Sequence, residues 1–505
     1  MNSSLSRLKE IDREIQLLEH TTALLGWDQE TYMPEKAIEE RAQQQSLLSG
    51  IIHDKLTGKE TSTLLSSLGI KDSAGAAESP LGETDRAFLR KFSRDFYRET
   101  KIPKELVVEF SREASLSQAA WIEARKKSDF SIFAPHLEKI LELTKEKAEK
   151  IGYAEHPYDA LLDEYEPFAT TSYVKSIFET LKPKLRNLVK EISRAGQVDD
   201  SFLKNKYSVD FQEKFGREIL VDLGYEFDRG RLDVSAHPFT TTLGFNDIRI
   251  TTRYREDSFK TGLFGIIHEC GHGLYELGID EKIAGTVLAQ GTSLGIHESQ
   301  SRTWENMIGL SLPFWKYYYP KLRKMFPTQL DGVTLEQFYR GINRSEPSLI
   351  RIDADEVTYS LHIILRFELE LQMISGELKV RDLPEAWNSG MKELLGITPA
   401  DDAEGVLQDV HWSFGAIGYF PTYALGNLYG AQFFQKLDRD LGGVDEIMER
   451  GDFKKILGWL RDNIHRYGSI YTAEELCMNA TGEALNPDYF IDYLEKKYSG
   501  IYGLK

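Results

Sequence analysis

The chain has 505 residues, of which 41% are hydrophobic, and its 62 lysines and arginines against 80 aspartates and glutamates give a net charge of −18. This length supports a large hydrophobic core, and the acidic balance argues against nucleic acid or an anionic membrane surface as a partner. Only Cys270 and Cys477 are present, which excludes a disulfide framework and fits a reducing compartment.

The first residues, "MNSSLSRLKEIDREIQ", lack the apolar centre of a signal peptide. No stretch of about 20 apolar residues is present that would span a bilayer. We therefore expect a cytoplasmic protein with no membrane partner.

Helical periodicity dominates the N-terminal part of the chain. Apolar residues recur at three- and four-residue steps, with polar residues on the outer face, in the segments 3–20, 34–55, 84–100, 103–127 and 131–151. These segments predict an antiparallel helical lobe. Residues 69–85 are rich in Gly, Ala, Ser and Pro and predict an exposed loop.

A different pattern follows at 232–256, "LDVSAHPFTTTLGFNDIRITTRYRE". Its β-branched and aromatic residues alternate around a Gly-Phe-Asn turn signal, which predicts a small antiparallel sheet. An exposed strand at that position would hold a peptide by main-chain hydrogen bonds and so favour broad specificity.

The next segment, "GIIHECGHGLYE" (265–276), has the periodicity of a buried helix. At 3.6 residues per turn, His268 and His272 share one face, where both imidazoles can bind one ion. Glu269 flanks that ion and is placed to act as a general base, the arrangement of the H-E-x-x-H motif. The alternative is a pair of core histidines with satisfied hydrogen bonds. Gly271 and Gly273 weaken the helix and indicate close approach by another backbone or a substrate.

A catalytic zinc site needs a third protein ligand and an open position. Glu276 lies eight residues after His268, about 12 Å along the helix, and is too distant to share the ion. Downstream, "LGIHESQSRTWEN" (294–306) predicts a second helix with three candidate ligands. Spacing alone places Glu298 only modestly ahead of His297 and Glu305.

Six ordered motifs carry a resemblance that spans nearly the whole chain. They are "HPF" (237–239), "DIRIT" (247–251), "HECGH" (268–272), "HESQ" (297–300), "IRIDAD" (350–355) and "GVLQDVHW" (405–412), and "LLGWDQETYMP" (24–34) precedes them. Together they resemble the carboxypeptidase Taq family of zinc metallocarboxypeptidases.

The resemblance implies His268, His272 and Glu298 as ligands of one zinc ion per subunit, which cobalt could replace. It implies Glu269 as the catalytic carboxylate and adds a homodimer. The fold expected is mostly α: a gluzincin-type helical metallopeptidase with a deep substrate channel and the small antiparallel sheet beside the zinc helix. We expect one catalytic domain, 1–505, with an N-terminal helical lobe (about 1–230) and a zinc-site lobe (about 231–505).

The expected chemistry is peptide-bond hydrolysis, in which Glu269 takes a proton from a zinc-activated water and passes it to the leaving amine. The oxyanion needs a further donor. Tyr423 and His411 are candidates, and the family context favours Tyr423, although it would also suit the core. His411 would then contact the substrate.

An exopeptidase must also recognise the chain end of its substrate. Arginine binds a carboxylate through paired charge-assisted hydrogen bonds, so Arg351 in "LIRIDADE" is the first candidate. It could instead pair structurally with Asp353 or Asp355. Gln408 and Asp409 would shape the same pocket or orient a ligating imidazole.

Two further residues are candidates for substrate contact. Arg249 would face the channel or form an ion pair with a nearby acid, and His237 would touch the substrate or stabilise a turn. The sequence thus predicts a zinc metallocarboxypeptidase that releases amino acids one at a time from free peptide C-termini, with broad specificity. An oligopeptidase cutting internal bonds and a non-catalytic zinc or peptide-binding protein are the alternatives.

Overall fold

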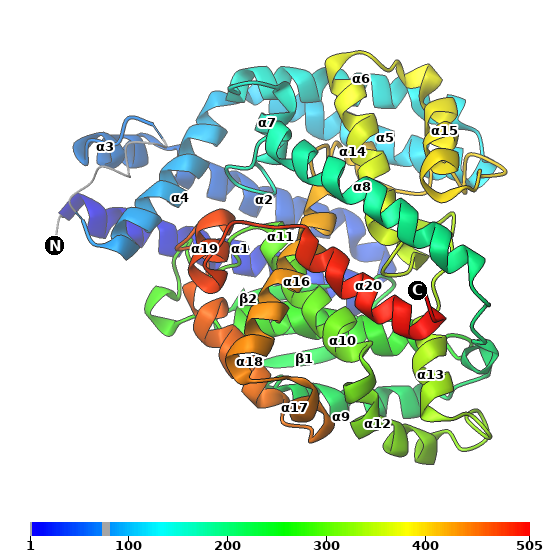
Figure 1. Ribbon diagram of the computed structural model, residues 1–505. Helices are drawn as coiled ribbons and strands as arrows, with labels where there is room; N and C mark the ends of the chain where they lie inside the picture. Colours follow the sequence, from blue (N-terminus) through cyan, green and yellow to red (C-terminus); the bar gives the residue numbers. More distant parts are fainter. Residues whose placement is uncertain (1–2, 73–80, 505) are drawn as a thin grey trace.

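The computed structural model describes residues 3–72 and 81–504 and is mostly helical (Figure 1). The five predicted N-terminal helices are confirmed, with the first reaching Thr31. Residues 73–80 of the predicted loop 69–85 lie outside the described residues. The helices before the sheet are α1 (Ser3–Thr31), α2 (Ile38–Thr57), α3 (Lys59–Ser67), α4 (Glu83–Lys101), α5 (Lys104–Lys127), α6 (Phe130–Ile151), α7 (Pro157–Leu162), α8 (Thr171–Arg194) and α9 (Val209–Leu223).

Helices also make up most of the chain after the sheet. They are α10 (Phe259–Leu277), α11 (Leu294–Arg302), α12 (Leu312–Met325), α13 (Leu335–Ile342), α14 (Tyr359–Ser375), α15 (Leu383–Leu395), α16 (Phe420–Leu441), α17 (Asp445–Glu449), α18 (Phe453–Asn463), α19 (Ala473–Thr481) and α20 (Asp488–Tyr502). A π-helical turn, η5 (Thr303–Gly309), continues α11. Helix α9 packs on α10, whereas α14 and α15 pack on α8, so segments distant in sequence lie side by side.

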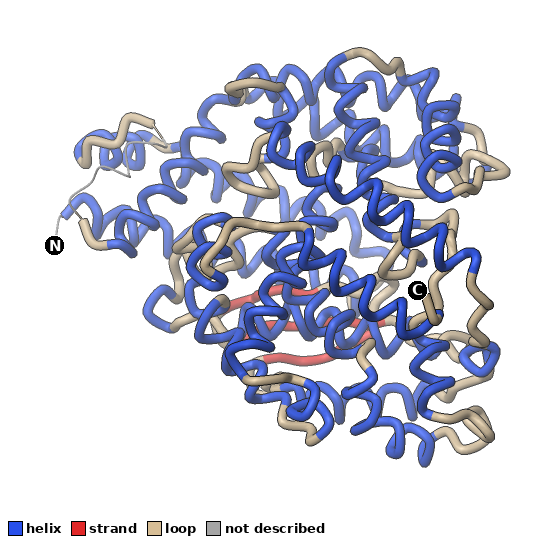
Figure 2. Tube along the Cα trace, in the orientation of Figure 1, coloured by secondary structure: helices blue, strands red, loops and turns tan. Residues whose placement is uncertain are grey.

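The small sheet comprises β1 (Gly230–Val234), β2 (Thr240–Gly244) and β3 (Asp247–Thr252), in the order β1-β3-β2 (Figure 2). Strands β2 and β3 are antiparallel, as the turn signal predicts, but β1 pairs with β3 in parallel. The prediction of a purely antiparallel sheet is therefore wrong. The segment 235–239 carries the chain from β1 to β2, which lies on the other side of β3. The chain then turns back along β3, which therefore runs in the same direction as β1.

The sheet lies between two helices. Ile248 and Ile250 are fully buried, and the Cγ2 atom of Ile250 lies 3.2 Å from the position that a Cβ on Gly273 of α10 would take. Because side chains alternate along a strand, Arg249 points to the opposite side, where its guanidinium lies 4.2 Å from the ring of Trp27 on α1. The sheet thus joins the N-terminal helices to α10.

Helices α10 and α11 approach closely at a glycine. A Cβ at Gly271 would lie 2.6 Å from the carbonyl oxygen of Gln300 and 2.6 Å from Cα of Ser301. A Cβ at Gly426 of α16 would lie 2.5 Å from Cγ of Glu298. The expectation of a close backbone approach at Gly271 is confirmed, and both glycines allow α11 to lie against its two neighbours.

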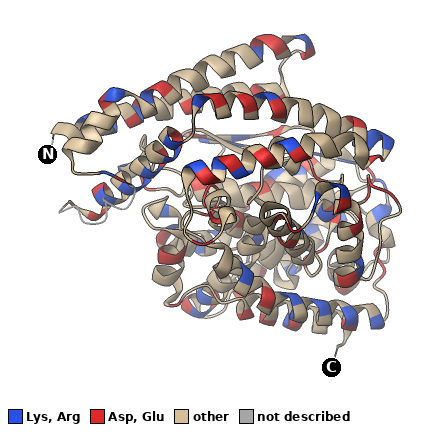
Figure 3. Cartoon of the chain, turned by 90° about the horizontal axis from the view of Figure 1, so that it is seen from above, with Lys and Arg blue, Asp and Glu red and all other residues tan. Residues whose placement is uncertain are grey.

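The main hydrophobic core runs from α5 to α20, and a smaller core packs α1, α3 and α4 against residues 279–288. Figure 3 shows acidic and basic residues interspersed along the outer helices, which is typical of a solvated surface. Within residues 3–72 and 81–504, no helix is both long and apolar enough to cross a bilayer.

Candidate active site

The two motif histidines and Glu298 converge. His268 and His272 lie one turn apart on α10, and Glu298 projects from α11. Its Oε2 atom lies 3.6 Å from Nε2 of His268 and 3.4 Å from Nε2 of His272. One atom from each residue lies within 4.8 Å of the other two. The arrangement provides three donor atoms directed at one point.

The other two candidate ligands lie behind the histidines. The Nδ1 atom of His268 is 2.8 Å from the carboxylate of Glu305. The Nδ1 atom of His272 is 2.6 Å from Nδ1 of His297, and Nε2 of His297 is 2.9 Å from the carboxylate of Glu276. Both imidazoles are therefore oriented through Nδ1, which leaves Nε2 for an ion.

Glu298 is held through both of its oxygens. Arg302 donates to Oε1 at 2.7 Å, and the Ser301 hydroxyl donates to Oε2 at 3.0 Å. Burial opposes ionisation of Glu298, but Arg302 and the two histidines hold the pKa of its carboxyl well below the usual value. Glu298 therefore stays ionised.

A divalent cation fits this cluster chemically. Glu269, Glu276 and Glu298 are buried and Glu305 is largely buried. Among the residues that the structure describes, Arg302 is the one permanently charged cation that forms ion pairs with these acids. Such an excess of buried negative charge requires compensation. Two imidazole nitrogens and one carboxylate oxygen are the donor set of catalytic zinc sites, with a coordination position left open.

Glu269 lies beside this cluster and is oriented by the sheet. The hydroxyl of Thr240 on β2 donates to its Oε2 at 2.6 Å. Burial raises the pKa of the Glu269 carboxyl, which suits a group that must accept a proton. Thr240 had no signal in the sequence beyond its place in a strand pattern, because the contact joins residues 29 positions apart.

Arg351 is buried and fixed in orientation, but not by either aspartate of its own "IRIDAD" segment. Its Nε and NH2 groups donate to Asp409 at 3.0 and 2.7 Å, and NH1 donates to the Tyr359 hydroxyl at 3.1 Å. Arg366 pairs with the second oxygen of Asp409, and Gln408 accepts from the Arg351 backbone. Two arginines share one carboxylate, so this pocket retains a positive charge.

Tyr423 and His411 lie together near Arg351. Nε2 of His411 is 3.4 Å from the Tyr423 hydroxyl, and the Arg351 guanidinium is 5.1 Å from the Tyr423 ring. Burial holds the pKa of Tyr423 well above its usual value and lowers that of His411 to about 4. Tyr423 therefore keeps its proton, and His411 is neutral at neutral pH.

The remaining two candidates lie outside these contacts. Arg249 donates to Asp247 at 2.8 Å through Nε and through NH2, and stacks on Trp27. The side chain of His237 is exposed, and its carbonyl accepts from the Ser235 hydroxyl at 2.6 Å. The ion pair weighed for Arg249 and the turn contact weighed for His237 are thus both present.

An H-E-x-x-H helix completed by a glutamate from a second helix, on a mostly helical scaffold, defines a metallopeptidase of the gluzincin class. Residues 7–498 match the family described as "Carboxypeptidase Taq (M32) metallopeptidase". The chain belongs to this family and is a metallocarboxypeptidase that acts on peptides.

Similarity to individual members extends over the whole chain. It is 43% identical to carboxypeptidase 1 of Bacillus subtilis, covering 97% of both chains. It is also 43% identical to thermostable carboxypeptidase 1 of Thermus thermophilus, covering 98% of both. The crystal structure of the M32 carboxypeptidase from Deinococcus radiodurans matches with a TM-score of 0.95 at 41% identity, covering 99% of this chain and 100% of that one.

Proposed function

We propose that the catalytic metal is zinc, one ion per subunit and replaceable by cobalt, held by His268, His272 and Glu298. When bound, it would supply Lewis acidity to the attacking water and to the scissile carbonyl. The convergence of these three donors, with Glu269 beside them, is the observation that carries the proposal.

Glu269 acts as general base and then general acid. Its carboxylate takes a proton from the attacking water and delivers it to the leaving amine as the peptide C–N bond breaks. Thr240 keeps Oε2 of this carboxylate in place. The neutral phenol of Tyr423 donates a hydrogen bond to the carbonyl oxygen as negative charge develops there, and His411 contacts the substrate on the same side.

Arg351 binds the terminal carboxylate of the peptide. Asp409 accepts from Nε and NH2 and Tyr359 accepts from NH1, which leaves one N–H of NH1 and one N–H of NH2 to pair with a carboxylate. Tyr359 links this pocket to the metal cluster, because Arg351 donates to its hydroxyl while Arg302 lies 4.6 Å from its ring. This link supports a chain-end pocket next to the reacting bond, as removal of a single residue requires.

Broad specificity follows from β2, which is an edge strand. Its free main-chain groups would pair with any peptide backbone irrespective of side chains. Arg249 contributes to substrate binding indirectly, because its contacts with Asp247 and Trp27 fix α1 on the sheet. His237, exposed beside β2, contacts the substrate from the solvent side.

Mass spectrometry tests this function directly. The metal-loaded protein is incubated with an unmodified peptide and with its C-terminal amide. We expect a ladder of products shortened one residue at a time from the free acid, and little product from the amide. Internal fragments from both peptides would instead establish an oligopeptidase, and no product from either would leave a non-catalytic binding protein.

We also propose a single catalytic domain, with the lobes near 1–230 and 231–505, that works as a homodimer in the cytoplasm. The low cysteine content fits a reducing compartment. Light scattering tests the assembly, because a dimer has twice the 57.8 kDa mass of the chain. A monomer mass at micromolar concentration would reject the dimer without affecting the enzyme.

A further inference from the structure

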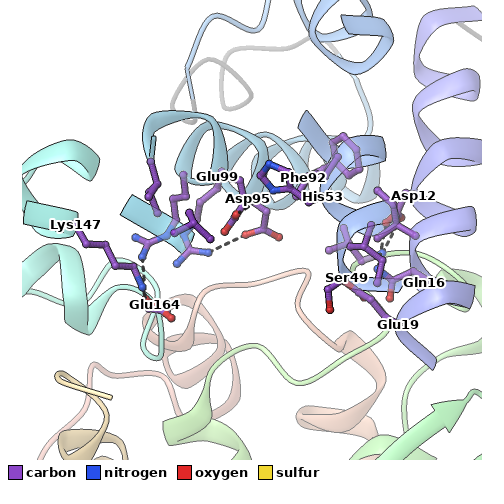
Figure 4. Close-up of a pocket in the computed structure, with 18 of the residues that line it drawn as sticks. Asp12, Gln16, Glu19, Ser49, His53, Phe92, Asp95, Glu99, Lys147 and Glu164 are labelled. Carbon is purple, nitrogen blue, oxygen red and sulfur yellow. Dashed lines mark hydrogen bonds and ion pairs between the residues drawn. The ribbon is translucent and has the colours of Figure 1, made fainter. Parts of the chain in front are cut away.

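A cavity of about 620 Å³ lies between the N-terminal helices α1, α2, α4 and α5 (Figure 4). Its lining contains none of the residues assigned above to the metal, the general base or the terminal carboxylate. Part of its wall is apolar, formed by Ile15, Ile52, Phe92 and Leu106. Its volume is ample for two or three amino-acid side chains.

The charged lining of the cavity is unbalanced. Each of its basic side chains already pairs with an acid, in the ion pairs Arg94–Asp163, Arg98–Asp163, Lys147–Glu164 and His53–Glu99. No arginine, lysine or histidine of the lining is therefore free to receive an anion.

Two acidic groups at the α1 side, Asp12 and Glu19, are not held in such ion pairs among the described residues. Glu19 forms no ion pair within residues 3–72 and 81–504, and its side chain is solvent-exposed where it borders the cavity. Although the residue is exposed, the surrounding helices remove part of the water around its carboxyl and raise its pKa; repulsion from Asp95 adds to this, and attraction to Lys91 offsets part of the effect. Burial also raises the pKa of Asp12 to about 7. This side of the cavity is suited to a cation.

At Gln16 the cavity adjoins a smaller hollow beside β2. Gln16 lines both the cavity and this hollow, which is formed with His20, Thr242 and Glu276. Thr242 donates to Glu276, and Thr240, two residues earlier in the same strand, donates to Glu269. An extended peptide paired with β2 would therefore run from the reacting bond toward the cavity.

A different set of contacts leads to the chain-end pocket. From Glu298, Arg302 and Tyr359 lead to Arg351, whereas the path through Glu276 leads to β2 and the cavity. A peptide with its carboxylate at Arg351 therefore directs its N-terminal residues toward α1.

We propose that this cavity is the subsite for the N-terminal residues of a peptide substrate, with apolar side chains against Ile52 and Phe92 and the α-ammonium group at Glu19. The inference rests on the proposed function, since Arg351 sets the direction of the peptide. A peptide α-amino group has a pKa near 8 and is largely cationic at neutral pH, so its charge is opposite to that of the Glu19 carboxylate.

The test is a length series of peptides with a common C-terminal sequence, each made with a free and with an acetylated N-terminus. We expect kcat/KM to favour the free amine by about tenfold, as for one charged contact, only at lengths that reach the cavity. Glu19→Gln should abolish this preference and leave kcat/KM for acetylated peptides unchanged. Glu30→Gln, a change on the same helix at an exposed glutamate outside the cavity lining, should retain the preference.

Each outcome has a distinct meaning. An equal rate for free and acetylated peptides at every length, or a preference that survives Glu19→Gln, overturns the subsite. An acetylated dipeptide is too short to reach the cavity and reports on the catalytic centre alone. If the wild type fails to hydrolyse even this substrate, the proposed function fails instead.

Discussion

The Nδ1 atoms of His272 and His297 face each other at 2.6 Å. Only one of two facing nitrogens can carry the proton. Nε2 of His297 lies 2.9 Å from the Glu276 carboxylate, which can only accept. His297 therefore carries its proton on Nε2 and accepts at Nδ1, and His272 donates from Nδ1. Nε2 of His272 keeps its lone pair on the side of Glu298, as metal binding requires.

His297→Ala should consequently weaken the metal site without removing a ligand. Loss of a residue that orients a ligating imidazole lowers metal affinity by about 10- to 100-fold. Competition titration with a chelator measures this, and Glu276→Gln should act in the same direction. His53→Ala is the matched control, because His53 is exposed on α2. Unchanged metal affinity in the His297 variant would show that His297 does not orient His272 for metal binding.

Glu269→Gln should bind the metal normally and lose turnover by about 100- to 10 000-fold, because it removes a general base and leaves the three donors in place. Elemental analysis and single-substrate kinetics on the same preparation separate the two effects. Glu298→Ala should instead lose the metal, because it removes one of the three donors. Near-normal turnover of fully loaded Glu269→Gln would remove Glu269 from the mechanism.

The spacing of residues in the sequence predicts much of the site. One helical turn between His268 and His272 is sufficient to predict that they meet, because the backbone alone sets that geometry. The third donor is different. Spacing alone barely separates Glu298 from His297 and Glu305, and only the ordered motifs clearly favour Glu298. In the structure all three surround the histidines, which is why a short sequence window could not separate them.

Other features depend on packing between distant segments. The contacts of Thr240 with Glu269 and of Arg351 with Asp409 join residues 29 and 58 positions apart. No periodicity encodes such pairs. The parallel placement of β1 likewise depends on which side of β3 the chain crosses, and an alternating pattern specifies strands but not their order.

Glu166 gives the metal-free protein a pH-dependent stability. This buried carboxylate accepts from the Ser293 hydroxyl and the Gly295 backbone, each at 2.9 Å, at the start of α11. Burial raises its pKa to about 7 from the usual value of 4.5. Between these values the folded state binds more protons than the unfolded state, so the contribution of Glu166 to stability falls as pH rises.

Glu166→Gln should therefore become more stable relative to wild type between pH 5 and pH 8, by an amount on the order of 1 to 3 kcal/mol. Thermal unfolding of metal-free wild type and variant across this range measures the difference. A Tm difference that stays constant with pH would show that the carboxyl is ionised throughout. Glu164→Gln, at a neighbouring carboxylate that is paired with Lys147 nearer the surface, serves as the control.

Arg351→Ala tests how the enzyme recognises a chain end. If Arg351 binds the terminal carboxylate, the change should raise KM and lower kcat/KM for free-acid peptides. Loss of one charge-assisted contact in a desolvated pocket costs on the order of 2 to 4 kcal/mol, or roughly 30- to 1000-fold. Metal content should change little, because the contacts of Arg351 are with Asp409, Tyr359 and Gln408 rather than with the donors.

A second substrate separates recognition from structural damage. Without Arg351, Asp409 would keep only its ion pair with Arg366. If the role of Arg351 were purely structural, its loss would therefore impair the hydrolysis of all substrates alike. For a C-terminal amide the wild type should already be slow, and Arg351→Ala should cost much less than for the acid. Arg351→Lys keeps the charge but cannot form paired hydrogen bonds, so it should fall between wild type and Arg351→Ala on the acid. Equal losses on acid and amide would assign Arg351 to pocket structure and make Arg249 the next residue to test.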